Sequence, residues 1–173
     1  VRTAEELKAG IDSVLVRIDS SLSGYNASSL LSRFNAGEAI VPDDIFIDIY
    51  GKSYGYYDET GGCVDVSAGA LFDLWGFGFT SDSLPSDTEV KKVLEDTGMG
   101  RLKRDMKSVL DSEGRLTAAA LLSDGVSGPP PVLNYNAVAQ GYSCDLVAAY
   151  LEKQGVTDML VDIGGEIYCR GYN

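Results

Sequence analysis

The chain has 173 residues, of which 45% are hydrophobic and 23% charged, so its size and composition are those of one soluble globular domain. A formal net charge of -12 would repel phosphate backbones and anionic membrane surfaces, which argues against nucleic-acid and membrane-surface partners. No apolar run approaches the roughly 18 residues needed to span a bilayer, and no signal-like segment opens the chain. Because the first residue is Val1 and not Met, we expect that a targeting segment has been trimmed.

Histidine is absent from the sequence. Its absence excludes Ser-His-Asp and Cys-His triads, the usual zinc sites and imidazole acid–base chemistry. Any catalysis by these residues must use carboxylates, amides, hydroxyls, backbone groups or a hard metal. Cys63, Cys144 and Cys169 are odd in number and lack metal-ligand spacing, so we expect three buried free thiols.

The first elements predicted along the chain are helical. Apolar residues recur at helical spacing over residues 3–22, and Thr3 forms a capping box with Glu6, so this segment predicts an amphipathic core helix. A glycine and an asparagine mark a turn around Tyr25, and a short helix is expected over residues 28–35.

A third helix is predicted to begin at residues 42–44 and to end at the glycine pair 61–62. Residues 63–69 are then expected to form a short strand that runs into a turn. The aromatic segment over residues 70–79, which includes Trp75, is expected to pack in the core.

The second half alternates helix and strand signals. A helix capped at Ser86 or Asp87 and closed by Gly98 comes first, followed by two strand-like runs within residues 107–120 around the turn Ser112–Gly114. A stiff surface connection is expected over residues 123–131. A helix over residues 137–154 and two short strands that meet at Gly164 and Gly165 complete the chain. The mixture predicts a single α+β domain over residues 1–173, an α/β sandwich in which helices pack on a mostly antiparallel sheet.

An amide-rich segment before the last predicted helix is the main candidate for a binding site. Asn134, Asn136 and Gln140 fall just before and within the first helical turn. Free backbone N–H groups and the helix dipole favour anionic oxygens there, such as those of a phosphate. The alternative is that Asn134 or Asn136 is only an N-cap, the commonest use of Asn at such a place.

Three further features each have two interpretations. Asp65 either caps the segment that follows it or accepts a hydrogen bond from a ligand. Tyr25 either stacks on an aromatic ring or is an ordinary exposed turn residue. Gly164 and Gly165 form either a tight turn or a place where the backbone approaches a ligand. Neither the P-loop nor the G-x-G-x-x-G fingerprint occurs, so a nucleotide site of the common kinds is not supported.

Four segments in register resemble the ApbE family, the FAD:protein FMN transferases. They are SSLSGYNASSLLSRFN, TGGCVDVSAGALFDLWGFGF, LNYNAVAQGYSCDLVAAYLEKQGV and MLVDIGGEIYCRG, and their order and spacing also fit the family. The resemblance spans nearly the whole chain. It implies a T-fold-like domain that is truncated at its C-terminal end, with FAD as substrate and magnesium as cofactor.

The resemblance also implies roles for particular residues in flavin binding. By position, Tyr25 is similar to the family's aromatic residue beside the flavin. Cys63, Val64 and Asp65 are similar to its FAD-binding triplet, in which the first residue is Ala and the second aromatic.

Three residues of the amide-rich segment take their implied roles from the same resemblance. Asn134 stands where many members have Asp, and Gln140 where they have Lys or Glu, both in contact with FAD. Ala137 stands where a residue contacts the metal through its backbone oxygen or a hydroxyl. The two amides keep hydrogen-bonding capacity but remove charge, so ligand geometry is expected to survive while metal affinity or rate changes.

The implied activity is magnesium-dependent transfer of FMN from FAD to a Thr or Ser hydroxyl of a target protein, with AMP as leaving group. The alternatives are FAD hydrolysis to FMN and AMP, and flavin binding without turnover. Family members continue into a segment with a His and with Asp and Thr magnesium ligands. We therefore expect the catalytic residue beyond Asn173, and weak FAD binding with little turnover from this chain alone.

The resemblance further implies a location and partners. Family members usually work outside the cytoplasm, often on the periplasmic face of a bacterial membrane through a lipid anchor, which we expect to be absent from this chain. Their flavin-acceptor proteins include subunits of redox-driven ion pumps.

Overall fold

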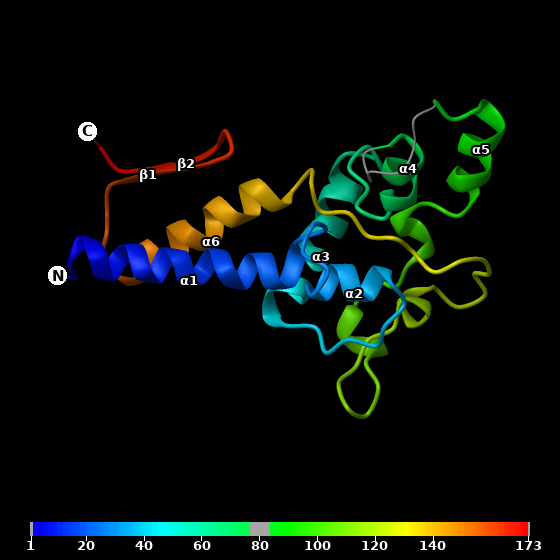
Figure 1. The fold of residues 1–173 in the computed structure, drawn as a ribbon, viewed down its shortest axis with the longest axis horizontal. Helices are drawn as coiled ribbons and strands as arrows, with labels where there is room; N and C mark the ends of the chain where they lie inside the picture. Colours follow the sequence, from blue (N-terminus) through cyan, green and yellow to red (C-terminus); the bar gives the residue numbers. More distant parts are fainter. Residues whose placement is uncertain (1, 77–83, 173) are drawn as a thin grey trace.

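The computed structural model describes residues 2–76 and 84–172, and this part of the chain is mostly helical (Figure 1). The α-helices are α1 (Ala4–Leu22), α2 (Leu30–Asn35), α3 (Asp44–Glu59), α4 (Gly69–Leu74), α5 (Asp87–Glu95) and α6 (Ala139–Lys153), joined by the short 3₁₀ helices η1 (Met99–Arg101), η2 (Met106–Val109) and η3 (Ala118–Leu121) and followed by strands β1 (Met159–Ile163) and β2 (Glu166–Arg170). Residues 77–79 of the predicted aromatic segment lie outside the described residues.

Helix α1 begins at the predicted capping box. The Glu6 N–H donates to Thr3 Oγ1 at 3.2 Å, and the Thr3 N–H donates to Glu6 Oε2 at 2.9 Å. The helix lies alongside α6 (Figure 1). The two helices approach so closely that a Cβ added at Gly10 would lie 1.8 Å from Tyr150 Oη. A side chain at this crossing would therefore overlap the tyrosine ring.

The two C-terminal strands form an antiparallel hairpin, as predicted. Met159 pairs with Arg170 and Ile163 with Glu166, across a turn in which Gly164 has a φ of 63° and Gly165 a φ of 97°. Glycine suits this turn because other residues rarely adopt positive φ at two successive positions. The inner face of the hairpin packs on α6 and forms a small apolar cluster with it: Cys144, Val147, Ala148 and Val161, with Met159, Ile163 and Tyr168 at its edge.

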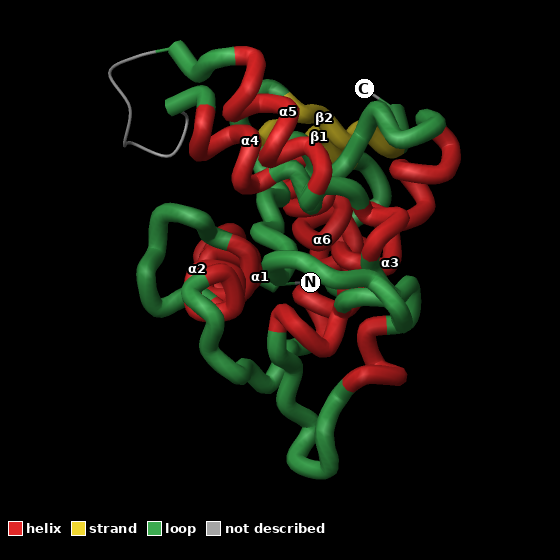
Figure 2. Tube along the Cα trace, turned by 90° about the vertical axis from the view of Figure 1, so that its right-hand side faces the viewer, coloured by secondary structure: helices red, strands yellow, loops and turns green. Residues whose placement is uncertain are grey.

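The larger core lies between α1, α2, α3 and the start of α6, and it contains an aromatic group. Phe34 and Phe46 have ring centroids 5.8 Å apart, and Phe46 meets Tyr135 edge-on at 6.2 Å. All three side chains are buried. Tyr135 therefore anchors the segment before α6 in this core. Figure 2 shows the helices α1, α3 and α6 gathered in the middle of the view.

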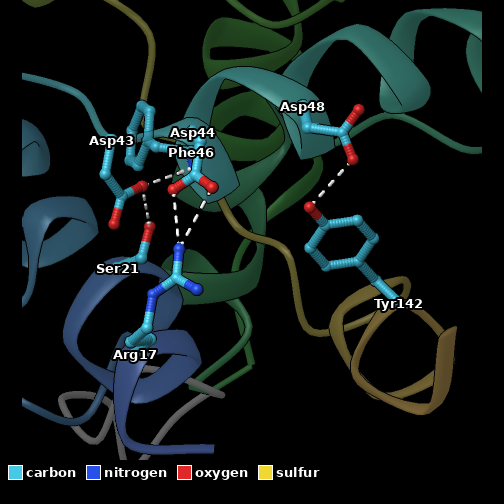
Figure 3. Close-up of polar contacts among 7 residues, drawn as sticks. All are labelled: Arg17, Ser21, Asp43, Asp44, Phe46, Asp48 and Tyr142. Carbon is cyan, nitrogen blue, oxygen red and sulfur yellow. Dashed lines mark hydrogen bonds and ion pairs between the residues drawn. The ribbon is translucent and has the colours of Figure 1, made fainter. Parts of the chain in front are cut away.

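Helix α3 is held against α1 by its own N-cap. Asp43 Oδ1 accepts from the Phe46 N–H and from Ser21 Oγ, both at 2.8 Å (Figure 3). Beside this contact, Arg17 Nη2 donates to both carboxylate oxygens of Asp44, at 2.9 and 3.1 Å. These contacts fix the α1–α3 pair on which α6 packs.

Helices α2, α3 and α5 and the surface connection over residues 123–131 also agree with the sequence predictions. The predicted mostly antiparallel sheet and the sandwich do not form within the described residues, where the hairpin is the one sheet. The predicted strand at residues 63–69 is a series of turns. The runs flanking the turn Ser112–Gly114 contain the 3₁₀ helices η2 and η3, and between these Leu116 forms an isolated antiparallel bridge with Ile40. The apolar residues therefore pack from tight turns and a single bridge, and the two predicted strands do not form.

Two burial predictions are wrong. The three cysteines are free, as expected, but only Cys144 is buried, whereas Cys63 lies in an exposed turn and Cys169 is exposed on the hairpin. Trp75 is 48% exposed. Helix α4 packs through its first residue, Gly69, where an added Cβ would lie 2.6 Å from the Val132 carbonyl oxygen. Trp75 lies at the other end of this short helix.

Candidate functional site

A cleft of about 330 Å³ brings Tyr25 and Asn134 together. It is lined by Gly24, Tyr25, Leu31, Ser32, Asn35, Gly69, Asp73, Val132, Leu133, Asn134 and Asn136. Its volume is at the lower end of the range for small-molecule sites. Tyr25 is 69% exposed and belongs to the lining of this cleft.

The turn that carries Tyr25 is held by serine side chains. The backbone N–H groups of Tyr25 and Asn26 donate to Ser23 Oγ at 3.3 and 3.1 Å. The Ser23 carbonyl oxygen accepts from Ser29 Oγ at 2.6 Å and from Ser32 Oγ at 3.1 Å. The serine-rich sequence thus ties the tyrosine turn to the start of α2.

Asn134 lies on an extended segment that pairs with the turns after Asp65. Its N–H donates to the Val66 carbonyl oxygen at 2.7 Å, and the Gly69 N–H donates to the Val132 carbonyl oxygen at 3.1 Å. Asn134 Oδ1 accepts from the Asn136 N–H at 2.9 Å, which makes a turn before α6. The N-cap of α6 is Val138, without a side-chain hydrogen bond, so the N-cap interpretation of Asn134 and Asn136 is wrong.

Asp65 caps the segment that follows it. Its Oδ1 accepts from the Ser67 N–H at 2.8 Å and from Ser67 Oγ at 2.6 Å, while Oδ2 accepts from the Met99 N–H at 3.2 Å. The capping alternative is therefore confirmed. The carboxylate does not line the cleft of Tyr25, but it supports the turns against which Asn134 pairs.

A second cleft of about 390 Å³ contains two other predicted residues, Val64 and Ala137. It lies between the end of α3, the start of α6 and the hairpin, with Asp145 and Glu166 among its lining residues. The segment from Asn134 to Gly141 lines both clefts, because Asn134 and Asn136 belong to the first and Ala137, Val138 and Gly141 to the second.

The remaining two predicted residues lie elsewhere. Gln140 contacts the hairpin turn, where a Cβ added at Gly164 would lie 2.4 Å from Gln140 Nε2. Cys63 is exposed and lines neither of the two clefts. Sequence reasoning missed Asn35 and Asp73, which line the first cleft, and no local sequence pattern indicates either one.

The described residues fit a magnesium ion only in part. No group of three or more Cys, Asp or Glu side chains that could hold a metal occurs among them. Ala137 can offer one backbone oxygen, whereas magnesium prefers near-octahedral oxygen coordination. This part of the chain therefore does not form a complete magnesium site.

The start of α6 is also tied to α3 by a hydrogen bond that crosses the domain. Tyr142 Oη donates to Asp48 Oδ2 at 2.9 Å (Figure 3), and Lys52 Nζ lies 2.9 Å from the same oxygen. Burial would raise the pKa of Asp48, but the hydrogen bonds from Lys52 and Tyr142 outweigh it and lower the pKa below its ordinary value of 3.8. Burial, followed by the bond to Asp48, raises the pKa of Tyr142.

Replacing Tyr142 by Phe is expected to lower the free energy of unfolding by about 1 kcal/mol at neutral pH. The pKa of Asp48 is lower in the folded than in the unfolded chain, so its carboxylate stabilises the fold above pH 3.8. This stabilisation is lost as the pH falls through the pKa of the folded chain. Urea unfolding from about pH 7 to about pH 3 should show the difference between wild type and Tyr142→Phe shrinking on the acid side. A constant difference would contradict this coupling, and Tyr172→Phe, at an exposed position, is the control.

The chain belongs to the ApbE family, which it matches over residues 1–173. It is 29% identical over 178 residues to the FAD:protein FMN transferase of Vibrio cholerae, with 100% of this chain and 49% of that protein covered. It is 28% identical over 177 residues to the FAD:protein FMN transferase of Escherichia coli K12, with 99% and 47% covered. The chain thus spans about half the length of the curated relatives it matches.

Solved structures agree with this assignment. The flavin transferase ApbE from Vibrio cholerae superposes with a TM-score of 0.79 at 29% identity, covering 100% of this chain and 53% of that one. The apo flavinyl transferase ApbE of Pseudomonas stutzeri gives a TM-score of 0.80 at 27% identity, covering 98% and 53%. The described helices are all too short or too polar to cross a membrane.

Proposed function

We propose that the chain is the flavin-binding part of an FAD:protein FMN transferase, and that residues 1–173 act as one domain within it. The transferase would move FMN from FAD to a Thr or Ser hydroxyl of a target protein. Family membership and the similarity to two FAD:protein FMN transferases support this proposal. Since the chain spans about half of those relatives, catalysis is proposed for the longer protein.

The observation that carries the proposal is the cleft shared by Tyr25 and Asn134. Tyr25 would stack on the isoalloxazine ring, because an exposed aromatic ring at a cleft is suited to a flat conjugated ligand. Asn134 would donate and accept hydrogen bonds at the polar part of the dinucleotide. The second cleft, which Val64 and Ala137 line, would receive the remainder of the molecule, and Gln140 would hold the pyrophosphate or ribose at its edge. Val64 would flank the flavin together with Cys63 and Asp65. Cys63 and Asp65 line neither cleft, so their proposed flavin contact rests on the family alone.

The proposed reaction is a phosphoryl-type transfer. The acceptor oxygen forms a bond to the FMN phosphorus, the bond from that phosphorus to the AMP oxygen breaks, AMP leaves, and a base takes the hydroxyl proton. The described residues would bind and orient FAD for this step. Magnesium, when bound, would neutralise charge on the pyrophosphate. Ala137 would supply one ligand, and the other ligands and the base would come from outside the described residues.

The acceptors would be extracytoplasmic proteins such as subunits of redox-driven ion pumps, with the transferase held by a lipid anchor at the periplasmic face of a bacterial membrane. This part of the proposal rests on the family alone.

Incubating the longer protein with FAD, magnesium and a flavin-acceptor domain tests the proposed transfer. We expect flavin fluorescence that stays with the acceptor after denaturation, together with one AMP released for each flavin attached. Free FMN and AMP without labelled acceptor would indicate hydrolysis instead. If the FAD stays unchanged, the protein binds flavin without turnover and the proposed transfer is wrong.

A further inference from the structure

One side-chain amide completes the backbone hydrogen bonding of the residue next to Asn134. Asn35 Nδ2 donates to the Leu133 carbonyl oxygen at 2.8 Å, and the Leu133 N–H donates to Asn35 Oδ1 at 2.9 Å. Leu133 is 1% exposed, so water cannot replace these bonds readily. The Asn35 amide has the same donor and acceptor as a peptide group, and it acts here as one rung of a strand pairing.

The direction of the neighbouring backbone groups explains why this rung is needed. In an extended segment, the N–H and C=O groups of alternate residues point to opposite sides. The Val132 carbonyl oxygen and the Asn134 N–H both bond to the turns of residues 66–69. The Leu133 groups point the other way, where Asn35 takes the place of a neighbouring strand.

Helix α2 thereby connects the two sides of the first cleft. At its start, Ser29 Oγ and Ser32 Oγ donate to the Ser23 carbonyl oxygen, which holds the turn of Tyr25. At its end, Asn35 holds Leu133, and Asn134 is the next residue. The six-residue helix α2 therefore links the turn of Tyr25 to the segment of Asn134.

We propose that Asn35 is a positioning residue that sets the place of Asn134 relative to Tyr25 and so the width of the flavin cleft. This proposal rests on the proposed function, since the width matters for the ligand that the cleft receives. Asn35 acts through the Leu133 backbone, and its own amide is occupied on both sides.

Asn35→Ala and Asn35→Asp separate the two bonds. Alanine removes both, whereas aspartate keeps an acceptor for the Leu133 N–H but places a carboxylate oxygen against the Leu133 carbonyl oxygen. Ser53→Ala is the matched control, because Ser53 is fully buried and its hydroxyl donates to the Ile49 carbonyl oxygen within α3, away from the cleft.

Two readouts on the 173-residue chain test the proposal: amide hydrogen exchange at Leu133 and Asn134, and the Kd for FAD from flavin fluorescence. We expect Asn35→Ala to raise the exchange rates of these two amides and the Kd for FAD, each by on the order of tenfold. Asn35→Asp should raise the Kd to a similar extent. Ser53→Ala should change neither the exchange rates nor the Kd, even if its Tm falls as far as that of Asn35→Ala.

Unchanged exchange in Asn35→Ala would overturn the proposal, as would an equal rise of the Kd in Ser53→Ala. Unchanged FAD affinity in both Asn35 variants would also overturn it. If the wild-type chain binds no FAD, the proposed function fails, while exchange at Leu133 still decides whether Asn35 fixes this segment.

Discussion

Replacing Gly10 by Ala is expected to lower the free energy of unfolding by about 1–3 kcal/mol. The added Cβ would lie 1.8 Å from Oη and 2.1 Å from Cζ of Tyr150, so the rigid ring or the whole of α6 must move. Within a helix, glycine to alanine is otherwise favourable by about 1 kcal/mol, which makes the expected sign informative. Chemical denaturation of the two proteins measures the difference.

Gly51→Ala is the matched control, since Gly51 lies within α3 and an added Cβ there meets nothing within 4 Å. This variant should be more stable than wild type by about 0.5–1 kcal/mol. In a Tyr150→Ala background, Gly10→Ala should become neutral or stabilising because the overlap is gone. If Gly10→Ala stabilises the unaltered protein, α1 and α6 do not cross as described.

Replacing Tyr25 by Ala is expected to weaken FAD binding strongly with little effect on folding. Stacking of a flat ring on an aromatic side chain contributes about 1–3 kcal/mol, or roughly ten- to hundredfold in Kd. Tyr25 is 69% exposed in a surface turn, so its removal should change the Tm little. Fluorescence titration with FAD and a thermal melt together measure the two effects.

Tyr172→Ala controls for loss of an exposed tyrosine, because Tyr172 is 93% exposed beyond β2 and lines neither of the two site clefts. Its FAD affinity should equal that of wild type. An unchanged Kd in Tyr25→Ala, or an equal loss in Tyr172→Ala, would remove Tyr25 from the proposed flavin contact.

The elements that the sequence predicts correctly are those with local causes. The capping box at Thr3 and Glu6 starts α1, and Gly164 with Gly165 permits the positive φ values of the hairpin turn. Each signal lies within a few residues of the structure that it produces, so neighbouring residues suffice to identify it.

The failures have a common physical reason, which is that distant contacts decide the outcome. Residues 63–69 have strand-like composition, yet Asp65 accepts hydrogen bonds from Ser67 and from the Met99 N–H of a distant segment, and turns result. The role of Asn35 depends on Leu133, 98 positions away in the sequence. Such a pairing leaves no periodic trace in the sequence.

The candidate site was foreseen in part. Tyr25 and Asn134 share a cleft, as the predicted flavin site requires, whereas Val64 and Ala137 line the adjoining cleft and Gln140 lies on the hairpin turn. Family resemblance supplied the candidate residues, and their contacts with FAD stay a prediction. The division of the segment around Asn134 between two clefts follows only from the path of the chain into α6.

Backbone amide chemical shifts during an FAD titration of the 173-residue chain test the central claim most directly. The account predicts that the largest shifts fall on Tyr25, Asn134 and Asn136, with smaller shifts at Ala137 and none at the exposed end of the hairpin near Leu160 and Cys169. Saturable shifts that cluster elsewhere, with Tyr25 and Asn134 unmoved, would contradict it.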